Sequence, residues 1–189
     1  MTANLIVIQG GSAVGKTTLA QRLATDLGLH LLTKDNFKEL LYDVLGTPPG
    51  RDESEVYGLA ATKALYASVA IFLSKGKSII IESAFHTEFA NLDIEAIVKD
   101  GSAGVVQIYV TASPKVRVDR YNERIASDKR HKSHPDSIGA ATEEYFANDH
   151  TIYGPLSIDD TIEVDTSTFT DDDYSKLLSS VREAVWEKS

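Results

Sequence analysis

The segment GGSAVGKT at residues 10–17 combines residue types that bind phosphate. It matches the pattern of glycine, any four residues, glycine, lysine and a hydroxyl residue. Glycines let backbone amides turn toward phosphate oxygens, Lys16 adds a mobile cation, and Thr17 offers a hydroxyl to Mg²⁺. The alternative is a glycine-rich turn that only joins a strand to a helix. The apolar run at residues 5–8 and the helical pattern after the loop favour nucleotide binding. The residues expected to bind the nucleotide here are Gly10, Gly11, Ser12, Ala13, Val14, Gly15, Lys16, Thr17 and Thr18.

Two carboxylates follow apolar runs that we expect to be strands. Asp35 lies after the second run, where parallel sheets bind ligands, and could accept the proton of an attacking hydroxyl and hold that hydroxyl in line. Alternatively, it only caps the helix that starts near Asn36. Glu82 ends a run of isoleucines. Because a buried carboxylate needs a partner, we expect Glu82 to bind Mg²⁺ with Thr17 or to contact a substrate hydroxyl, rather than to be a plain acid at a strand end.

The predicted acceptor pocket combines these acids with nearby aromatic and polar residues. Its expected members are Asp35, Phe37, Glu82, Phe85 and His86. His86 could instead belong to a solvated loop. Such a mixed lining leaves sugars, nucleosides, antibiotics and amino sugars open as acceptors.

A basic segment stands out in an otherwise acidic chain. The net charge is −9, yet residues 115–132 carry seven basic and three acidic side chains. Arg117, Arg120 and Arg124 recur at i, i+3 and i+7, so on a helix they form one stripe. Arginine binds phosphate oxygens in pairs through its planar guanidinium, so this stripe could close over donor phosphates. The alternative is a solvated helix face whose arginines pair with neighbouring acids.

Short apolar runs alternate with helical patterns along the chain. The runs lie at 5–8, 29–32, 78–81, 105–110 and 161–164, and an amphipathic stripe extends from Leu59 to Leu73. This alternation indicates parallel strands joined by right-handed crossovers, with helices on both faces of the sheet. We expect a three-layer α/β fold with a five-stranded parallel sheet, as one domain over residues 1–189. Thr170 is the expected N-cap of the last helix.

Composition restricts the class of protein and its surroundings. The chain has no cysteine, which excludes a thiolate nucleophile and a cysteine zinc site and suits the cytoplasm. The first residues lack the basic region of a signal peptide, and the apolar runs are too short to span a membrane. A net charge of −9 argues against a general nucleic-acid or anionic-membrane binder. We expect a soluble protein of unspecified oligomeric state.

Five segments, in this order, resemble the small P-loop kinases grouped with zeta toxin and chloramphenicol phosphotransferase, many of them predicted AAA-domain kinases. The segments are GGSAVGKTTLAQRLA, LLTKDNFKELLYD, SIIIESAF, RVDRYNERIASDKRHKSH and IEVDTS. The resemblance implies transfer of the γ-phosphate of ATP to a hydroxyl of a small-molecule acceptor, with Mg²⁺, beneath an arginine-rich lid at about residues 114–137. It also implies that the loop at residues 165–167 contacts adenine through Thr166; the alternative is an ordinary turn between a strand and a helix. The catalytic residues that it implies are Lys16, Asp35, Arg120, Arg124 and Arg130.

Two absent motifs separate this chain from other nucleotide-binding classes. It lacks the Asn-Lys-x-Asp element of guanine-binding proteins, and no expected strand ends in Asp-Glu as in ATP-driven machines. We therefore interpret the chain as a small phosphotransferase. The alternatives are a polynucleotide 5′-hydroxyl kinase and a non-catalytic ATP-binding regulatory module. A role as a toxin would depend on which metabolite is phosphorylated.

Overall fold

Five parallel strands form one sheet at the centre of the computed structural model, which describes residues 2–127, 131–134 and 140–187. In space the strands follow the order β2-β3-β1-β4-β5, and every neighbouring pair is parallel. The strands are β1 Asn4–Gln9, β2 His30–Thr33, β3 Ile79–Glu82, β4 Gly104–Thr111 and β5 Thr161–Asp165. The predicted five-stranded parallel sheet is confirmed, because each strand coincides with most of one apolar run.

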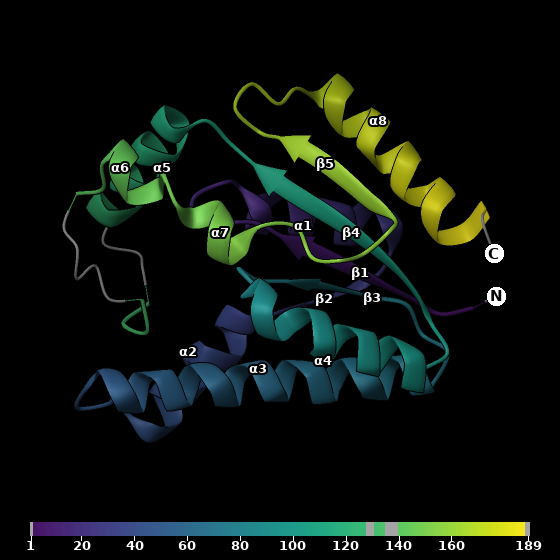
Figure 1. The fold of residues 1–189 in the computed structure, drawn as a ribbon, viewed down its shortest axis with the longest axis horizontal. Helices are drawn as coiled ribbons and strands as arrows, with labels where there is room; N and C mark the ends of the chain where they lie inside the picture. The colour runs from purple at the N-terminus through teal and green to yellow at the C-terminus, as the bar shows by residue number, and fades with distance from the viewer. Residues whose placement is uncertain (1, 128–130, 135–139, 188–189) are drawn as a thin grey trace.

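Helices cover both faces of the sheet and give a three-layer molecule (Figure 1). Ile6 and Ile8 of β1 pack beneath α1 and α8, whereas Leu5 and Val7 pack beneath α3 and α4 on the opposite face. All four side chains are fully buried. The four helices are α1 Lys16–Leu27, α3 Arg51–Ser74, α4 Thr87–Asp100 and α8 Asp171–Arg182. Successive side chains of β1 thus point to opposite faces of the sheet and contribute to the apolar core on each face.

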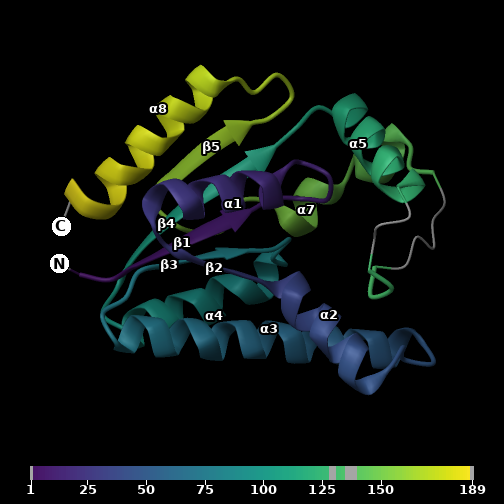
Figure 2. The ribbon, with the colours of Figure 1, turned by 180° about the vertical axis from the view of Figure 1, so that it is seen from behind.

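Beyond the carboxyl ends of the strands lie α2, α5, α6 and α7 (Figure 1). Figure 2 shows α2 and α5 at the same end of the molecule, beyond the loop that precedes α1. Two short helices, α6 and α7, lie between α5 and β5 in the chain, and a π-helical turn follows α8. These elements are α2 Lys34–Leu45, α5 Pro114–Ala126, α6 Glu143–Phe146, α7 Asp149–Tyr153 and the turn Glu183–Glu187.

The start of α2 corrects one interpretation of the sequence. Thr33 is the N-cap, and its hydroxyl oxygen accepts a hydrogen bond from the Asn36 amide at 3.1 Å. Asp35 is therefore not the cap, and its carboxylate remains for another role. At α8 the prediction is confirmed, since Thr170 is the N-cap and forms a reciprocal capping box with Asp173.

α3 is longer and more apolar than we expected. By length and composition alone it could cross a membrane, so the expectation that no apolar segment reaches that length was wrong. Leu65, Val69 and Leu73 pack its inner face on the sheet, although only 28% of its most apolar stretch is buried. Leu59, expected in the same stripe, is 60% exposed. In Figure 1 the N-terminal part of α3 runs past the strands and lies beside α2.

Candidate active site

A cavity of about 960 Å³ surrounds the start of α1. The loop at residues 10–15 wraps this helix terminus with left-handed backbone at Ala13 (φ 61°) and Gly15 (φ 88°). At Gly10, any side chain would collide with the Val110 carbonyl. The Lys16 amine donates a hydrogen bond to the Gly11 carbonyl at 2.5 Å, and burial lowers the pKa of this amine. The cavity therefore offers an anion a helix N-terminus, a curved backbone loop and a cation.

A buried ion pair supports this loop from behind. Arg117 of α5 donates through Nε to the Ser12 carbonyl at 2.9 Å and through Nη2 to the Asp149 carboxylate of α7. Its guanidinium also lies 4.2 Å from the centroid of the Phe146 ring. A side chain at Gly11 would collide with both members of the ion pair. Arg117 thus supports the loop. The expectation that it closes over the donor phosphates together with Arg120 and Arg124 was wrong.

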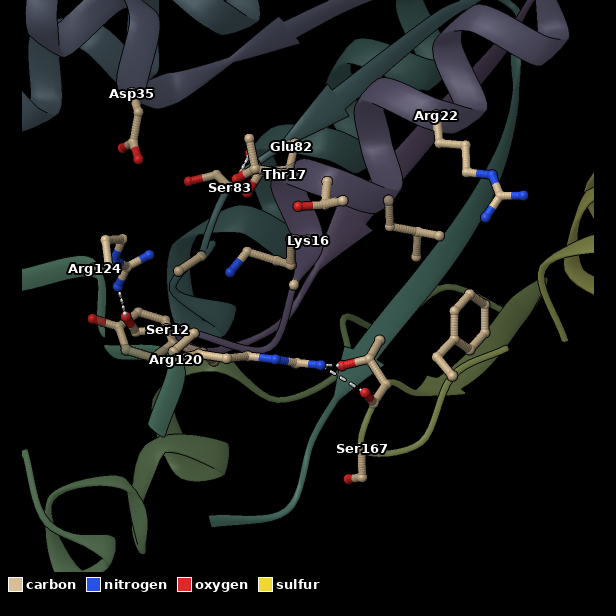
Figure 3. A pocket seen from close by; sticks show the side chains of 18 of the residues that line it. Ser12, Lys16, Thr17, Arg22, Asp35, Glu82, Ser83, Arg120, Arg124 and Ser167 are labelled. Carbon is tan, nitrogen blue, oxygen red and sulfur yellow. Dashed lines mark hydrogen bonds between the residues drawn. The ribbon is translucent and has the colours of Figure 1, made fainter. Parts of the chain in front are cut away.

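Thr17 and Glu82, the two residues expected to bind Mg²⁺, contact each other inside the cavity. The Thr17 hydroxyl donates to Glu82 Oε2 at 3.1 Å (Figure 3). Burial raises the pKa of the Glu82 carboxyl, and the charge of Lys16 opposes this shift. Mg²⁺ in proteins takes one or two carboxylates together with phosphate oxygens and waters. A hydroxyl and a carboxylate beside a phosphate-binding loop fit that donor set.

Asp35 lies on the rim of the same cavity, in the first turn of α2. Its side chain is 61% exposed. Figure 3 shows its carboxylate apart from Lys16 and Glu82, across open space within the cavity. This position leaves room for an acceptor hydroxyl between the carboxylate and the phosphate loop.

Residues 131–134 of the expected lid contact α2. His134 Nε2 lies 3.0 Å from Glu39 Oε1 and 3.9 Å from a carboxylate oxygen of Asp35, and His131 Nε2 lies 3.1 Å from Asp43 Oδ1. The contact with His131, followed by that with Lys132, lowers the pKa of the Asp43 carboxyl. Arg130, expected to be catalytic, lies outside the described residues. The described part of the lid segment therefore touches the helix that carries Asp35.

Arg120 and Arg124 both line the cavity but make different contacts. Arg120 donates through Nη1 to the Thr166 hydroxyl at 2.9 Å and through Nη2 to the Thr166 carbonyl at 2.8 Å. The Thr166 hydroxyl in turn donates to the Val14 carbonyl at 2.7 Å. Arg124 Nη2 donates to the Ser12 hydroxyl at 3.3 Å (Figure 3). Arg120 thus connects α5, the loop after β5 and the phosphate loop, while Arg124 reaches the loop from its open side.

A second cavity, of about 790 Å³, adjoins the first. Phe85 and His86, two residues expected at the acceptor, line it. Phe37 lies elsewhere, because it packs against the core between the sheet and α3. The residues that line both cavities are Lys34, Ser83, Ala84 and Tyr153. The shared lining means that a molecule in the second cavity could reach the first.

Two buried glutamines were missed in our reading of the sequence: Gln9 holds a wall of the second cavity, and Gln107 holds the segment that precedes β5. Gln9 Nε2 donates to the carbonyls of Phe85 at 2.8 Å and Gly154 at 3.0 Å, and Gln9 Oε1 accepts from the Phe85 amide at 2.8 Å. Gln107 Oε1 accepts from the Leu156 amide at 2.8 Å. A polar side chain in a buried strand needs such partners. The signal that could have revealed them is their position, because Gln107 lies within the apolar run 105–110 and Gln9 directly follows the run 5–8.

The same fold occurs in solved structures. A candidate kinase from Chloroflexus aurantiacus is 34% identical, with a TM-score of 0.86 over 98% of this chain and all (100%) of that chain. A gluconokinase from Sinorhizobium meliloti is 15% identical, with a TM-score of 0.58 over 96% of this chain and 93% of that chain. Kti12 from Chaetomium thermophilum, in complex with ADP-AlF3, is 17% identical, with a TM-score of 0.67 over 96% and 98% of the two chains. At these lower identities the likeness concerns the fold.

Sequence comparisons point to the same group. An uncharacterized protein of Mycobacterium tuberculosis is 25% identical over 125 residues, which make up 63% of this chain and 25% of that protein. The chain thus spans about a quarter of the length of this curated relative. The model of the family described as AAA domain (AAA_33) matches residues 5–147, from β1 through the phosphate loop, Asp35, Glu82 and α5. This match covers most of the chain, so the protein belongs to the AAA domain family, and its fold is that of the small P-loop kinases.

Proposed function

We propose that the protein is a phosphotransferase that moves the γ-phosphate of ATP to a hydroxyl of a small-molecule acceptor, as a single kinase domain over residues 1–189. The observation that carries the proposal is the junction of two cavities, with the phosphate loop in one and the exposed Asp35 carboxylate beside the residues shared by both. The 34% identity to a candidate kinase supports it.

The reaction needs a hydroxyl held in line with the transferred phosphorus. A bond forms between the acceptor oxygen and the γ-phosphorus, and the bond from that phosphorus to the bridging oxygen of ADP breaks. Asp35 accepts the hydroxyl proton, and the products are ADP and a phosphate ester. Because phosphoryl transfer passes through a loose transition state, Asp35 contributes mainly by orienting the hydroxyl.

The donor side of the site stabilises negative charge on the phosphates. We assign this role to the amides of residues 10–15, to Lys16 and to Arg124, with Arg130 as a further cation of the lid. Arg120 holds Thr166 against the loop, and we place adenine beside this contact. Thr17 and Glu82 would hold Mg²⁺, which neutralises phosphate charge when it is bound.

An acceptor screen tests the proposal. Purified protein receives ATP and Mg²⁺ with sugars, amino sugars, nucleosides, other small alcohols or 5′-hydroxyl oligonucleotides, and ADP release is followed. We expect at least one small alcohol to raise ADP release, and Asp35→Asn to lower the stimulated rate about 10²–10⁴-fold. Asp52→Asn is the matched control, because Asp52 occupies the first turn of α3 and is exposed away from both cavities.

Each other outcome of the screen has its own meaning. Stimulation by oligonucleotides alone, with a steep salt dependence, would establish the polynucleotide kinase alternative. Tight ATP binding without stimulated ADP release would support the regulatory module. Full activity of Asp35→Asn would remove Asp35 from the mechanism.

A further inference from the structure

The residues that line the second cavity indicate which class of acceptor could bind there. It lies between α2, α3 and α4 and adjoins the donor cavity at Lys34, Ser83, Ala84 and Tyr153. Lys34 directly precedes Asp35 in the chain. A molecule in this cavity could therefore present a hydroxyl toward Asp35 while its remaining groups contact α2, α3 and α4.

Part of the charge in this cavity is neutralised within the protein. Arg51 Nε lies 2.9 Å from Glu55 Oε1, and Lys63 Nζ lies 3.1 Å from Asp93 Oδ2. All four side chains belong to residues that line the cavity. Both acidic residues of the lining are thus committed to basic partners.

Two lysines in the lining remain without such a partner. Within residues 2–127, 131–134 and 140–187, neither Lys34 nor Lys38 forms an ion pair with a carboxylate. They are four residues apart on α2, so they share one helix face, and like charges at this spacing repel each other. Burial lowers the pKa of the Lys34 amine, and the charge of Lys38 adds to that shift while Asp35 opposes it. A bound anion would offset this unfavourable placement of two cations.

The rest of the cavity wall is aromatic and aliphatic. The rings of Tyr66 and Phe85 stack with centroids 6.2 Å apart, and His86 lies beside Phe89 with centroids 5.0 Å apart. Leu59 also lines the wall. Such a wall suits the carbon skeleton of a ligand, so the two lysines are the part of the cavity that selects for charge.

We propose that the acceptor is an anionic alcohol: a small molecule with a carboxylate or phosphate group that Lys34 and Lys38 bind, and a hydroxyl group that faces Asp35. This inference rests on the proposed phosphotransferase function and adds the substrate class. The phosphorylated product is then a molecule with two anionic groups, the original one and the new phosphate ester.

Matched pairs of acceptors test the inference. Gluconate is compared with glucitol, 4-(hydroxymethyl)benzoate with benzyl alcohol, and glucose 6-phosphate with glucose, so that each pair differs mainly in one anionic group. The first two pairs probe a carboxylate and the third a phosphate. ADP release with ATP and Mg²⁺ gives kcat and KM, and calorimetry with a non-hydrolysable ATP analogue gives binding without turnover.

Three variants accompany the panel. Lys34→Met and Lys38→Met each remove one cation and keep an unbranched side chain that is one atom shorter. Lys75→Met makes the same change at an exposed residue that ends α3. We expect Lys34→Met and Lys38→Met each to raise the KM of the preferred anionic acceptor about 10- to 100-fold with little change in kcat, and Lys75→Met to change neither.

The outcomes separate this inference from the proposed function. Preference for the anionic member of a pair, lost in the two α2 variants alone, supports the inference. Phosphorylation of neutral members with equal or better kcat/KM overturns it, while the phosphotransferase function stands. If no acceptor raises ADP release, the proposed function fails on this panel. The binding measured by calorimetry then tests the anion site by itself. The anion site is supported if the anionic molecule of a pair binds and the variants Lys34→Met and Lys38→Met abolish this binding. It is overturned if the anionic and the neutral molecule bind equally, or if neither binds.

Discussion

The surroundings of the phosphate loop and of the second cavity, which we propose as the donor side and the acceptor side, are built in opposite ways. Around the phosphate loop, polar side chains are buried and paired across long stretches of chain, as in Arg117 with Asp149 and Arg120 with Thr166. Around the second cavity, Leu59 is 60% and Leu92 71% exposed. Buried polar contacts therefore hold the proposed donor side in place, whereas the proposed acceptor side has exposed apolar side chains.

Removing Arg117 should produce the largest effect, on stability. Arg117→Met leaves the Asp149 carboxylate, 19% exposed, without its partner, and we expect a loss of about 3–5 kcal/mol in the free energy of unfolding. Thermal unfolding should show a decrease in Tm on the order of 10 °C. Asp171→Asn is the control, because it breaks an ion pair with Arg22 in which Asp171 is 88% exposed. Equal, small shifts for both variants would mean that the donor side is no more fixed than the surface.

Replacing Lys16 should abolish most activity and spare the fold. We expect Lys16→Met to lower kcat/KM about 10²–10³-fold for every acceptor, because the donor side serves them all. The Tm should stay the same or rise, since burial already disfavours the charged amine. Kinetics with two unrelated acceptors check this prediction. A decrease in kcat/KM for only one of the two acceptors would contradict the assignment of Lys16 to the donor side alone.

Glu82 should produce opposite pH dependences in activity and in stability. Its pKa is raised by burial above the ordinary value of 4.5. Activity should fall as the pH decreases through this raised value, because a protonated Glu82 cannot hold Mg²⁺. Without Mg²⁺, the stability should instead increase over the same interval, since the folded protein binds the proton more tightly than the unfolded chain.

The variant Glu82→Gln separates the two effects of Glu82. It should lose activity at all pH values, and its stability in this pH interval should lack the increase on acidification. Tm values recorded with a chelator at closely spaced pH values provide the measurement. An identical pH dependence of stability in both proteins would contradict the assigned pKa shift.

The smallest effect is expected on the acceptor side. Leu92→Ser should change the free energy of unfolding by about 0.5 kcal/mol or less, because the side chain is mostly exposed. Urea unfolding measures this change. A loss several times larger would show that the acceptor side is packed as closely as the donor side.

Features that depend on neighbouring residues were predictable from the sequence. The strands, the phosphate loop and the Thr170 cap each follow from a run, a motif or one helix terminus. The cap of α2 is instructive, because Thr33 and Asp35 are both good capping residues. The choice between them depends on the residue at which β2 ends, and sequence patterns locate such ends only to within a few residues.

Features that depend on long-range contacts were not predictable. Three arginines share one stripe of α5, yet Phe146 of α6 and Asp149 of α7 cover Arg117, whereas Arg124 lines the cavity. Asp149, the partner of Arg117, lies 32 residues away from it in a short helix without a periodic pattern. Phe37 was expected at the acceptor for its type alone, but the face of α2 on which it lies turns toward the core.

The side chain of Gln9 has a consequence for how such an enzyme could change substrates. Its backbone leads directly into Gly10, while its amide holds Phe85 of the acceptor wall by both backbone groups. One residue of the sheet thus connects the start of the phosphate loop to Phe85. Side chains on α3 and α4 can therefore be replaced, in evolution or by design, without a change in the contacts of Gln9 that connect the phosphate loop to the second cavity.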